Sequence, residues 1–416
     1  MLILYRILTI IIFVFTPLIL IYRLIKKKES LIRFKEKFCF SSKIRAKGKL
    51  IWFHGASVGE LQSIIPLLEI YDKEKKIKQI LVTSNTLSSS KIIQKLKLKK
   101  VIHQFYPLDI NFFTKKFLNY WSPSVCFFID SEVWPNMIFN LKRKQIPIIL
   151  LNGRITKKSF RRWSLFSEFA KKVFGKFDLC FSSNKETRKY LISLGANNIK
   201  YIGNLKYAES EKKNYQMNGH LKKFMKNKKV WCASSTHFDE EKLCGYIHKK
   251  LKTKYKNLLT IIIPRHINRI EEIKKDLTKL NLNVHLDEPN LKIKNNTDIY
   301  LVNAYGKTKA FYSNCKNVFL GGSIVNRGGQ NPLEAARYGC QILHGENVSN
   351  FHEVYKFLSE NKVSISTKTL SNFTKKLDML LSNKKSMSKN IKKKINNIGS
   401  EILKSTQKEI SLFLKK

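Results

Sequence analysis

The sequence is short of acidic residues. Asp and Glu together number 30 in 416 residues, against 79 Lys and Arg, which leaves a formal net charge of +49. Such an excess attracts polyanions, which include nucleic acids, anionic lipids and phosphorylated glycolipids. The lysines are spread along the whole chain, a pattern that drift toward Lys in an AT-rich coding sequence also produces. The charge by itself therefore does not identify a partner.

Cysteine is sparse and never paired in the sequence. The seven cysteines stand singly, with no C-x-x-C spacing, and their number is odd. This arrangement argues against a disulfide framework or a zinc site and indicates reduced thiols in a cytosolic compartment. The chain also lacks the G-x-G-x-x-G pattern and the Lys-Ser/Thr of a P-loop, which argues against a dinucleotide or ATP site. We expect neither a metal nor a cofactor.

Long uncharged stretches are absent except at the amino terminus. Ile7–Tyr22 carries no charge, and it lies between Arg6 and a basic segment that holds Arg23 and Lys26–Lys28. A membrane span needs about 20 apolar residues, so this stretch spans only if the flanking arginines reach the interface. A cleaved signal peptide would be followed by small residues, which are missing here. We expect an uncleaved membrane-anchor helix over residues 1–28, with the rest of the chain on the cytoplasmic side.

Short apolar segments alternate with helix-length polar segments along the rest of the chain, which predicts βαβ units and parallel sheets. The first series of predicted strands is Lys49–His54, Gln79–Val82, Ser124–Ile129, Ile146–Leu151 and Leu179–Ser182. The second series is Val230–Ala233, Leu259–Ile263, Val284–Leu286, Val318–Leu320 and Gln341–Leu343.

The two series predict an α/β protein with two Rossmann-like, doubly wound domains that face a cleft. The domains cover residues 29–207 and 230–416, and the Lys-rich, polar stretch 208–229 is the linker between them. Ligands of open α/β sheets bind outside the carboxyl ends of the strands, so we expect the functional groups in the loops that follow each predicted strand.

In the first half, two such loops carry candidate chemical groups. The loop His54–Glu60 places small residues between a strand and a helix, which lets backbone N–H groups approach an anion or a sugar. Glu60 is either a general base or a complement to the helix dipole. Asp130 closes another strand, where it lies in the crevice of the sheet or caps the next helix. The secondary candidates in these loops are Ser57, Gly59 and Glu132.

Lys206 ends the first half, within Gly203–Tyr207, and is a candidate for contacting a phosphate or a carboxylate. In the second half, Arg265 follows a predicted strand, and Arg suits bidentate recognition of phosphate. Gly321–Glu334 holds two glycine pairs, one after a strand and one before a Pro-initiated helix, which predicts an anion cradle.

Hydroxyl residues before a carboxylate-rich turn, at Ser235 and Thr236, mark either a helix start or a polar pocket. Glu334 is placed to accept hydrogen bonds from ribose hydroxyls. The secondary candidates of the second half are Ser235, Thr236, His266, Gly322 and Ser323.

Taken together, these segments resemble the family of Kdo transferases of lipopolysaccharide assembly, where Kdo is 3-deoxy-D-manno-octulosonic acid. Nine stretches occur in the family's order between about residue 50 and residue 355. They are IWFHGASVGE, YPLD, DSEVWPN, IPIILLNGRITKKSF, GNLKY, SSTHFDEE, IPRH, GGSIVNRGGQNPLEAA and Asn350-Phe351.

The resemblance implies a GT-B fold and an inverting, metal-independent transfer of Kdo from CMP-Kdo to a lipid A precursor, lipid IVA. It implies a location on the cytoplasmic face of the bacterial inner membrane, with anionic lipids as partners and no nucleic acid. Glu60 matches the family's general base, and Asp130 and Lys206 match positions that stabilise the transition state. The matching CMP-binding positions are Pro264, Arg265, Tyr305, Gly306, Lys307, Asn331, Pro332, Leu333 and Glu334.

The chain departs from the family's pattern at two positions. The family usually has Glu where this chain has Asp130, and it usually has Asp-x-x-Gly-Glu where this chain reads Asn303–Lys307. Two other readings stay open. A GT-B-like nucleotide-sugar epimerase would share the fold and the glycine-rich cradle. A non-enzymatic protein that binds membranes or nucleic acids would show aromatics interleaved with Lys and Arg, which the sequence lacks.

Overall fold

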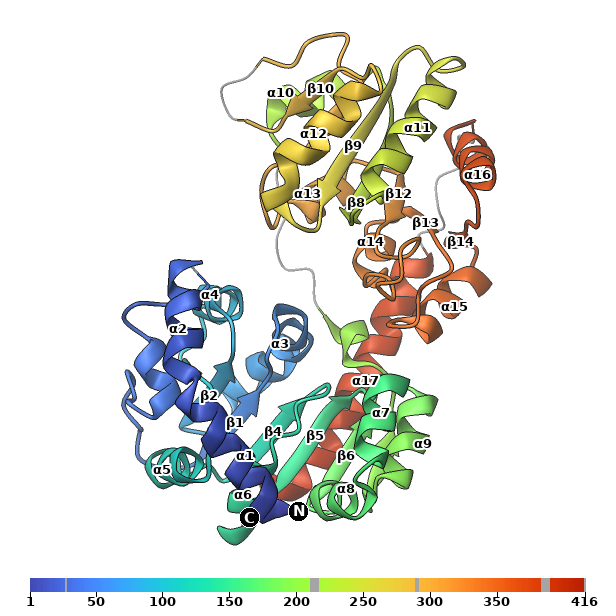
Figure 1. Ribbon diagram of the computed structural model, residues 1–416. Coiled ribbons are helices and arrows are strands. Elements are labelled where there is room, and N and C mark those ends of the chain that lie inside the picture. Colours follow the sequence, from blue (N-terminus) through green and yellow to red (C-terminus); the bar gives the residue numbers. More distant parts are fainter. Residues whose placement is uncertain (27, 210–216, 289–291, 383–389, 415–416) are drawn as a thin grey trace. The chain divides into compact units, whose positions relative to one another are not determined.

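Two parallel sheets of seven strands organise the chain, one in each of two units (Figure 1). Unit 1 comprises Met1–Ser210 and Ile398–Lys416, and unit 2 comprises Glu211–Asn397. Helices cover both faces of each sheet, which confirms the α/β class and the pair of doubly wound domains of the GT-B fold. The computed structural model describes residues 1–26, 28–209, 217–288, 292–382 and 390–414.

The sheet of unit 1 has the strand order β3-β2-β1-β4-β5-β6-β7. Its strands are β1 (Leu50–His54), β2 (Gln79–Ser84), β3 (Val101–Phe105), β4 (Val125–Ile129), β5 (Ile148–Gly153), β6 (Leu179–Ser182) and β7 (Ile199–Tyr201). Its helices are α1 (Leu2–Val14), α2 (Thr16–Ile25), α3 (Val58–Lys73), α4 (Leu87–Lys95), α5 (Asn111–Trp121), α6 (Pro135–Arg143), α7 (Lys157–Ser164), α8 (Ser167–Phe174) and α9 (Lys185–Ser193). The strand order reverses between β1 and β4, which makes the loops after these two strands the expected ligand site of the unit.

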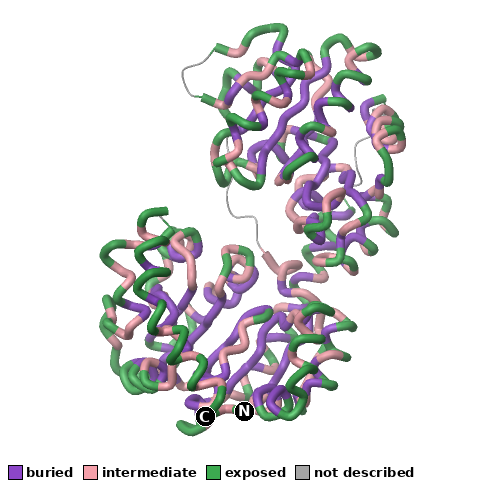
Figure 2. Tube along the Cα trace, in the orientation of Figure 1, coloured by how far each residue is buried: buried purple, intermediate pink, exposed green. Residues whose placement is uncertain are grey.

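Strands β1, β2, β4, β5 and β6 of unit 1 are buried along their whole length, and their successive side chains point to opposite sides of the sheet. Trp52 and Phe128 enter one hydrophobic core with residues of α5, α6 and α8. Phe53 and Phe127 enter the other core, with residues of α3. Figure 2 shows the strands as the buried centre of the unit, with exposed residues on the surrounding helices and loops.

The sheet of unit 2 has the order β10-β11-β9-β8-β12-β13-β14, so its reversal lies between β8 and β12. Its strands are β8 (Lys229–Thr236), β9 (Leu258–Pro264), β10 (Val284–Leu286), β11 (Ile299–Leu301), β12 (Asn317–Leu320), β13 (Gln341–His344) and β14 (Ser364–Ser366). Its helices are α10 (Gly219–Met225), α11 (Glu240–Lys252), α12 (Ile270–Lys279), α13 (Thr308–Tyr312), α14 (Leu333–Arg337), α15 (His352–Glu360) and α16 (Leu370–Ser382), and α17 (Asn390–Leu414) begins in this unit. Short 3-10 helices lie at η1 (Phe34–Phe38), η2 (Leu205–Ala208) and η3 (Ile267–Arg269).

The carboxyl-terminal boundary differs from the one expected from the sequence. The sequence predicts a single domain over residues 230–416, but the structure assigns Ile398–Lys416 to unit 1. The reason is hydrophobic: Ile402 and Ile410 of α17 are buried in the same core as Phe53. Burial of these side chains holds the end of α17 in unit 1, although this segment follows unit 2 in the sequence.

The stretch that the sequence predicts as a linker also differs in the structure. Of residues 208–229, the stretch 210–216 lies outside the described residues. The remainder includes α10, whose Leu221 and Met225 are buried one helical turn apart. This part of the polar stretch is therefore a helix that belongs to unit 2.

The amino-terminal apolar stretch forms two helices instead of the single anchor helix expected over residues 1–28. α1 and α2 meet at Phe15 with a bend of 50°. Pro17 lies in the first turn of α2 and has no backbone N–H, so it cannot continue the hydrogen bonding of α1. No helix among the described residues is long and apolar enough to cross a membrane alone, and this bent pair meets the length and composition criteria only jointly.

All ten predicted strands are present, and four further strands were not predicted. β3, β7 and β14 lie at sheet edges, and β11 lies next to the edge strand β10. Central strands of a parallel sheet are buried on both faces and read as continuous apolar runs. Edge strands lack that signature, since segments such as Ile199–Tyr201 include a charged residue and are only partly buried.

Candidate active site

The predicted catalytic residues of unit 1 lie in loops at one edge of its sheet. Glu60 follows β1, Asp130 follows β4, and Lys206 lies in η2, after β7. Because all strands are parallel, their carboxyl ends share this edge. The structure therefore brings the three residues to the position where open α/β sheets bind ligands.

Glu60 closes a capping box at the start of α3. Its carboxylate accepts hydrogen bonds from the backbone N–H of Ala56 at 2.6 Å and from the Ser57 hydroxyl at 2.9 Å, and Ser57 Oγ accepts the N–H of Glu60. Burial raises the pKa of Glu60 to about 7, and the negative charges of Asp130 and Glu132 add to the increase. A half-buried carboxyl group with a pKa near neutrality is suited to accept a proton.

Two N–H groups of the loop before α3 are taken by the protein itself. The N–H groups of Ala56 and Ser57 both donate to Glu60 Oε2. Gly59 has open space where a Cβ would stand, so its lack of a side chain is not required by packing. Ala56 and Ser57 thus hold the glutamate instead of an external anion.

Asp130 sits in a strained backbone conformation with a φ of 55°. Its Oδ1 accepts the side-chain amide of Asn152 at 2.5 Å, and its Oδ2 lies 3.4 Å from Lys206 Nζ. Asn152 Oδ1 also accepts the N–H of Leu205 at 2.9 Å, which ties η2 to β5 and to the loop after β4. Asn152 was not predicted as a site residue, although it directly follows the predicted strand Ile146–Leu151.

Glu132 is held by two neighbouring side chains. Its Oε2 lies 3.0 Å from His54 Nε2 and accepts the indole N–H of Trp134 at 2.8 Å. Burial alone would raise the pKa of Glu132, but these partners outweigh it and keep the pKa below its usual value. Glu132 is therefore a carboxylate anion close enough to Glu60 to act on its pKa.

His54 was missed as a functional residue in the sequence. It is fully buried at the end of β1, with Nδ1 3.0 Å from the Thr83 hydroxyl and its ring stacked 3.8 Å from Tyr106. Both ring nitrogens therefore have partners, Thr83 at Nδ1 and Glu132 at Nε2. A histidine at the end of an otherwise apolar strand was the available signal.

The predicted donor residues of unit 2 follow four neighbouring strands, β11, β9, β8 and β12. Pro264 ends β9, and the N–H of Arg265 bonds to the carbonyl of Thr236, which joins the loops after β9 and β8. The Arg265 side chain is exposed and makes no ion pair within the described ranges. Ser235, near the end of β8, has a φ of 56° where the pairing of β8 with β9 shifts register, and α11 begins at Glu240 as the helix-start signal predicts.

Arginines and histidines gather at this edge of unit 2. Burial lowers the pKa of His237 to about 4, and the positive charges of His266, Arg327, Arg265 and Arg269 add to the decrease. The pKa of His266 is lowered by burial and by the same three arginines. Burial and the nearby guanidinium groups both disfavour the protonated rings, and the arginines themselves give this edge a positive potential, which favours an anionic ligand. His237 and Arg327 were not among the predicted residues.

The first glycine pair of the predicted anion cradle is occupied by a side chain of the protein itself. Glu240 is buried, and its carboxylate accepts the N–H groups of Gly322 at 2.7 Å, Ser323 at 3.2 Å and Ile324 at 3.1 Å. It also accepts the N–H of His237 at 2.9 Å. The prediction that Gly322 and Ser323 face a ligand anion is corrected: their N–H groups bind Glu240.

The second half of the cradle leads into α14, which has only five residues. Asn331 Oδ1 accepts the N–H of Leu333, and the side chain of Leu333 is buried behind Pro332. Glu334 Oε1 lies 3.2 Å from Lys309 Nζ. Glu334 is therefore paired with a lysine of α13, and its binding of ribose hydroxyls stays a prediction.

The loop after β11 carries the other predicted donor residues. Tyr305 is exposed, and Gly306 has a φ of 81° with open space around it. Lys307 Nζ lies 2.6 Å from Asp287 Oδ2. The positive charge that departs from the family's pattern is thus paired with a carboxylate of this chain.

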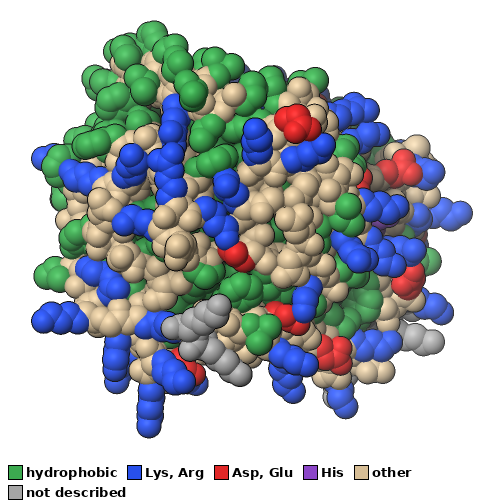
Figure 3. All heavy atoms as spheres, turned by 90° about the horizontal axis from the view of Figure 1, so that it is seen from below, with side chains coloured by type: hydrophobic (Ala, Val, Ile, Leu, Met, Phe, Trp, Pro, Cys, Tyr) green, Lys and Arg blue, Asp and Glu red, His purple; other side chains and the backbone are tan. Residues whose placement is uncertain are grey.

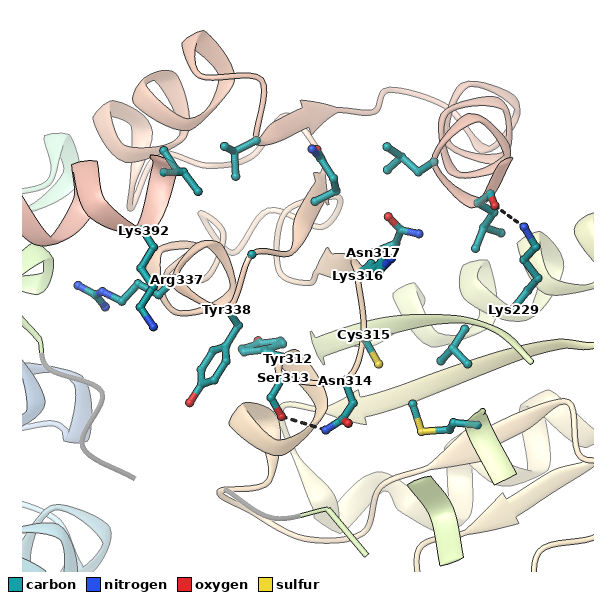
Figure 4. Close-up of a pocket in the computed structure, with 18 of the residues that line it drawn as sticks. Lys229, Tyr312, Ser313, Asn314, Cys315, Lys316, Asn317, Arg337, Tyr338 and Lys392 are labelled. Atoms are coloured by element: carbon teal, nitrogen blue, oxygen red, sulfur yellow. Dashed lines mark hydrogen bonds between the residues drawn. The ribbon is translucent and has the colours of Figure 1, made fainter. Parts of the chain in front are cut away.

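A groove of ≈ 1850 Å³ lies elsewhere in unit 2 (Figure 4). It opens where β8, β12 and β13 begin, so it is at the sheet edge opposite to the predicted donor residues, and none of those residues lines it. Among the residues that the structure describes, nine lysines and Arg337 line it, and no Asp or Glu does. Lys229 at one side bonds to the carbonyl of Leu381, as Figure 4 shows. Ligands of open α/β sheets bind at the carboxyl edge, where the predicted donor residues lie, so the groove is not the site that the sequence predicts.

Comparison with known proteins identifies the family. Residues 32–209 match the family described as 3-deoxy-D-manno-octulosonic-acid transferase (kdotransferase). The 3-deoxy-D-manno-octulosonic acid transferase of Rickettsia bellii is 33% identical over 365 residues, covering 87% of this chain and 87% of that protein. A probable mitochondrial 3-deoxy-D-manno-octulosonic acid transferase of Arabidopsis thaliana is 32% identical over 376 residues, covering 87% of this chain and 84% of its own length.

Solved structures share the fold. A putative UDP-N-acetylglucosamine 2-epimerase from Listeria monocytogenes matches with a TM-score of 0.61 at 13% identity, covering 88% of this chain and 97% of that chain. A glycosyltransferase from Rickettsia africae matches with a TM-score of 0.59 at 11% identity, covering 89% and 100%. Likeness at this identity concerns architecture alone.

The sequence relatives decide between the readings that the sequence left open. They extend over most of the chain and include both units, whereas the epimerase shares only the fold. They also exclude a non-enzymatic binding protein. The chain therefore belongs to the 3-deoxy-D-manno-octulosonic acid transferase family and is a glycosyltransferase of the GT-B fold.

Proposed function

We propose that this protein transfers Kdo from CMP-Kdo to the lipid A precursor lipid IVA, with inversion at the anomeric carbon and without a metal ion. The observation that carries the proposal is the raised pKa of Glu60 beside two other carboxyl groups. Its pKa of about 7 and its place beside Asp130 and Glu132 supply a base that is half ionised near neutral pH.

In the proposed reaction, Glu60 accepts the proton of the attacking acceptor hydroxyl. The hydroxyl oxygen bonds to the anomeric carbon of Kdo while the bond to the CMP phosphate breaks on the opposite face, which inverts the configuration. Glu60 would have to leave its contact with Ser57 to reach the hydroxyl, a small rotation at an exposed helix start. Lys206, paired with Asp130, supplies a positive charge fixed near the reacting groups.

The leaving phosphate gains negative charge, and unit 2 supplies the compensating positive groups. Arg265 is exposed and free of a carboxylate partner in the described ranges, and Arg327 lies in the glycine-rich loop. Together with the positive potential at His237, they support stabilisation of a phosphate by guanidinium groups. This arrangement is the basis for proposing a reaction without a metal, in which Glu334 binds the ribose.

We place the enzyme on the cytoplasmic face of the bacterial inner membrane, attached by its amino-terminal helices. The acceptor in the proposal is a lipid, and the net charge of +49 favours anionic headgroups. Nucleic acid is not a partner in this proposal.

The test is incubation of the purified protein with CMP-Kdo and lipid IVA in the presence of EDTA, followed by mass spectrometry of the lipid. We expect a mass increase of one or more Kdo units. Glu60→Gln should lose product at least 100-fold while it still binds CMP. Glu74→Gln, at the exposed end of the same helix, is the matched control and should retain activity. Full turnover by Glu60→Gln contradicts the base assignment, loss of turnover in EDTA contradicts metal independence, and an unmodified lipid contradicts the acceptor.

A further inference from the structure

The two amino-terminal helices have a protein-facing stripe and a solvent-facing surface. Residues of the protein-facing stripe are buried or half-buried and recur every three or four positions, as one face of a helix requires. They are Leu2, Tyr5, Arg6, Thr9, Phe13, Thr16, Leu20, Arg23 and Leu24. The pattern continues across the bend at Phe15, so both helices lie along unit 1.

The polar side chains of α1 point toward the protein. The Tyr5 hydroxyl donates to Asp109 Oδ2 at 2.8 Å, and Arg6 Nε donates to Asn136 Oδ1 at 3.2 Å. Phe13 packs edge-on against Phe38 and Phe113, with ring centroids 6.3 and 5.5 Å away. These contacts make α1 an integral part of unit 1.

Asp109 links α1 to the catalytic loop. Besides Tyr5, its carboxylate accepts the N–H groups of Asn136 at 3.1 Å and Met137 at 2.9 Å, in the first turn of α6. α6 begins directly after the segment that carries Asp130, Glu132 and Trp134. A helix that left this position to cross a membrane would strip a buried carboxylate of one of its three hydrogen bonds.

The outward surface of the same helices is apolar without interruption. The side chains exposed by 48% or more include Ile3, Leu4, Ile7, Leu8, Ile10, Ile11, Ile12, Val14, Phe15, Leu18, Ile19, Ile21 and Ile25. A helix on a water-exposed surface has its polar side outward, so this pair is inverted. Figure 3 views the molecule from below, so the front of Figure 1, where α1 and α2 lie, is at the top of the picture. Hydrophobic side chains gather along this upper part. A contiguous apolar surface of this kind marks a contact with another apolar phase.

The rim of this surface is basic. Lys26, Lys28 and Lys35 are exposed beside it, together with the apolar side chains of Leu31 and Ile32, which are 77% and 86% exposed. Lipid phosphates complement these charges, whereas a second copy of the chain would bring the same lysines together. Charge thus favours an anionic bilayer over self-association as the occupant.

We propose that α1 and α2 lie in the plane of the membrane interface, with the outward surface among the acyl chains and the inward stripe docked on unit 1. This inference rests on the membrane attachment proposed above and specifies its geometry. α1 is about 20 Å long, short of the roughly 30 Å of a hydrocarbon core, and its contacts hold it against the protein. The amino terminus then stays on the same side of the bilayer as the catalytic loops, and a lipid acceptor is presented next to them.

Sidedness distinguishes this geometry from a membrane span. A short epitope is fused to the amino terminus of the full-length protein, and the same epitope at the carboxyl terminus serves as control. We expect both epitopes to be cleaved by added protease in inverted inner-membrane vesicles and both to be protected in spheroplasts. An amino-terminal epitope cleaved only in spheroplasts overturns the in-plane geometry but leaves membrane attachment intact. Failure of the protein to sediment with either membrane overturns the attachment itself.

Two sets of variants test the two surfaces separately. Replacing Ile7, Ile11 and Val14 by Ser should lower partition into phosphatidylglycerol-containing vesicles more than tenfold, because three apolar side chains leave the acyl region. Tyr5→Phe should leave partition unchanged but lower the melting temperature, since Asp109 loses a buried donor. Tyr22→Phe, which removes an exposed hydroxyl, is the control and should change neither. A triple variant that partitions normally, or a parent protein that dimerises without binding vesicles, contradicts a lipid occupant.

Discussion

The two units place a glutamate at the same topological position and use it differently. In unit 1, the strand beside the reversal of strand order leads into α3, with Glu60 in the first turn. In unit 2, the corresponding strand leads into α11, with Glu240 in the first turn. Both carboxylates accept backbone N–H groups of glycine-containing loops.

The partners of the two carboxylates explain their different roles. Glu60 binds only its own loop, remains half-buried and is surrounded by Asp130 and Glu132, so its pKa rises to about 7. Glu240 is buried and reaches the loop after the neighbouring strand β12, where it binds a row of N–H groups. One glutamate is left reactive, and the other fixes the loop that precedes the donor residues.

Glu240→Gln should have the largest effect on this comparison. The amide places a donor against N–H donors of Gly322 and Ser323, which costs about 3 kcal/mol in a buried site. We expect much faster hydrogen exchange in the loop after β12 and a lower melting temperature. Glu271→Gln, in the exposed first turn of α12, is the control. If Glu240→Gln exchanges and melts like the parent, Glu240 does not hold the loop.

Arg265→Lys should have the next largest effect, because Lys cannot make a bidentate contact with a phosphate. We expect about a tenfold rise in the Kd for CMP, measured by isothermal titration calorimetry. Arg162→Lys, on the exposed surface of α7, should bind CMP like the parent. Unchanged affinity in Arg265→Lys would remove Arg265 from the donor site.

Glu132→Gln should shift the pH dependence of the reaction with a smaller effect on its maximum. The negative charge of Glu132 contributes to the raised pKa of Glu60, so its removal lowers that pKa. Glu60 then loses its proton at a lower pH. The acidic limb of kcat/KM, expected near pH 7 in the parent, should move to lower pH. A limb that stays in place, or moves upward, would contradict the coupling of the two carboxyl groups.

Lys307→Ala should have the smallest effect. Lys307 is exposed and paired with Asp287 outside the arginine cluster. An exposed ion pair contributes little, so the Kd for CMP should change less than about twofold. A tenfold loss of affinity would show instead that Lys307 binds the nucleotide.

The sequence was most informative about features that depend on a single strand, helix or loop. All ten strands that the apolar runs predict are present in the structure, and the small residues around Ser57 predicted the start of α3. The sequence was silent where residues far apart meet. Asn152 and Asp130 are 22 positions apart, and His54 and Glu132 are 78 apart, so no local pattern could join them. Three of the four missed strands, β3, β7 and β14, lie at sheet edges, where a strand need not be apolar throughout.

The sequence alone therefore determined the class of fold, the loops that carry the candidate residues and the family's motifs, because these depend on local periodicity and short-range residue order. Tertiary structure decided which charged groups share an environment. It put Glu240 into the predicted anion cradle, drew Ile402 into the core of unit 1 and turned the polar side of α1 inward. Each of these outcomes depends on burial beside residues from distant parts of the chain, and burial sets the cost of an unpaired polar group.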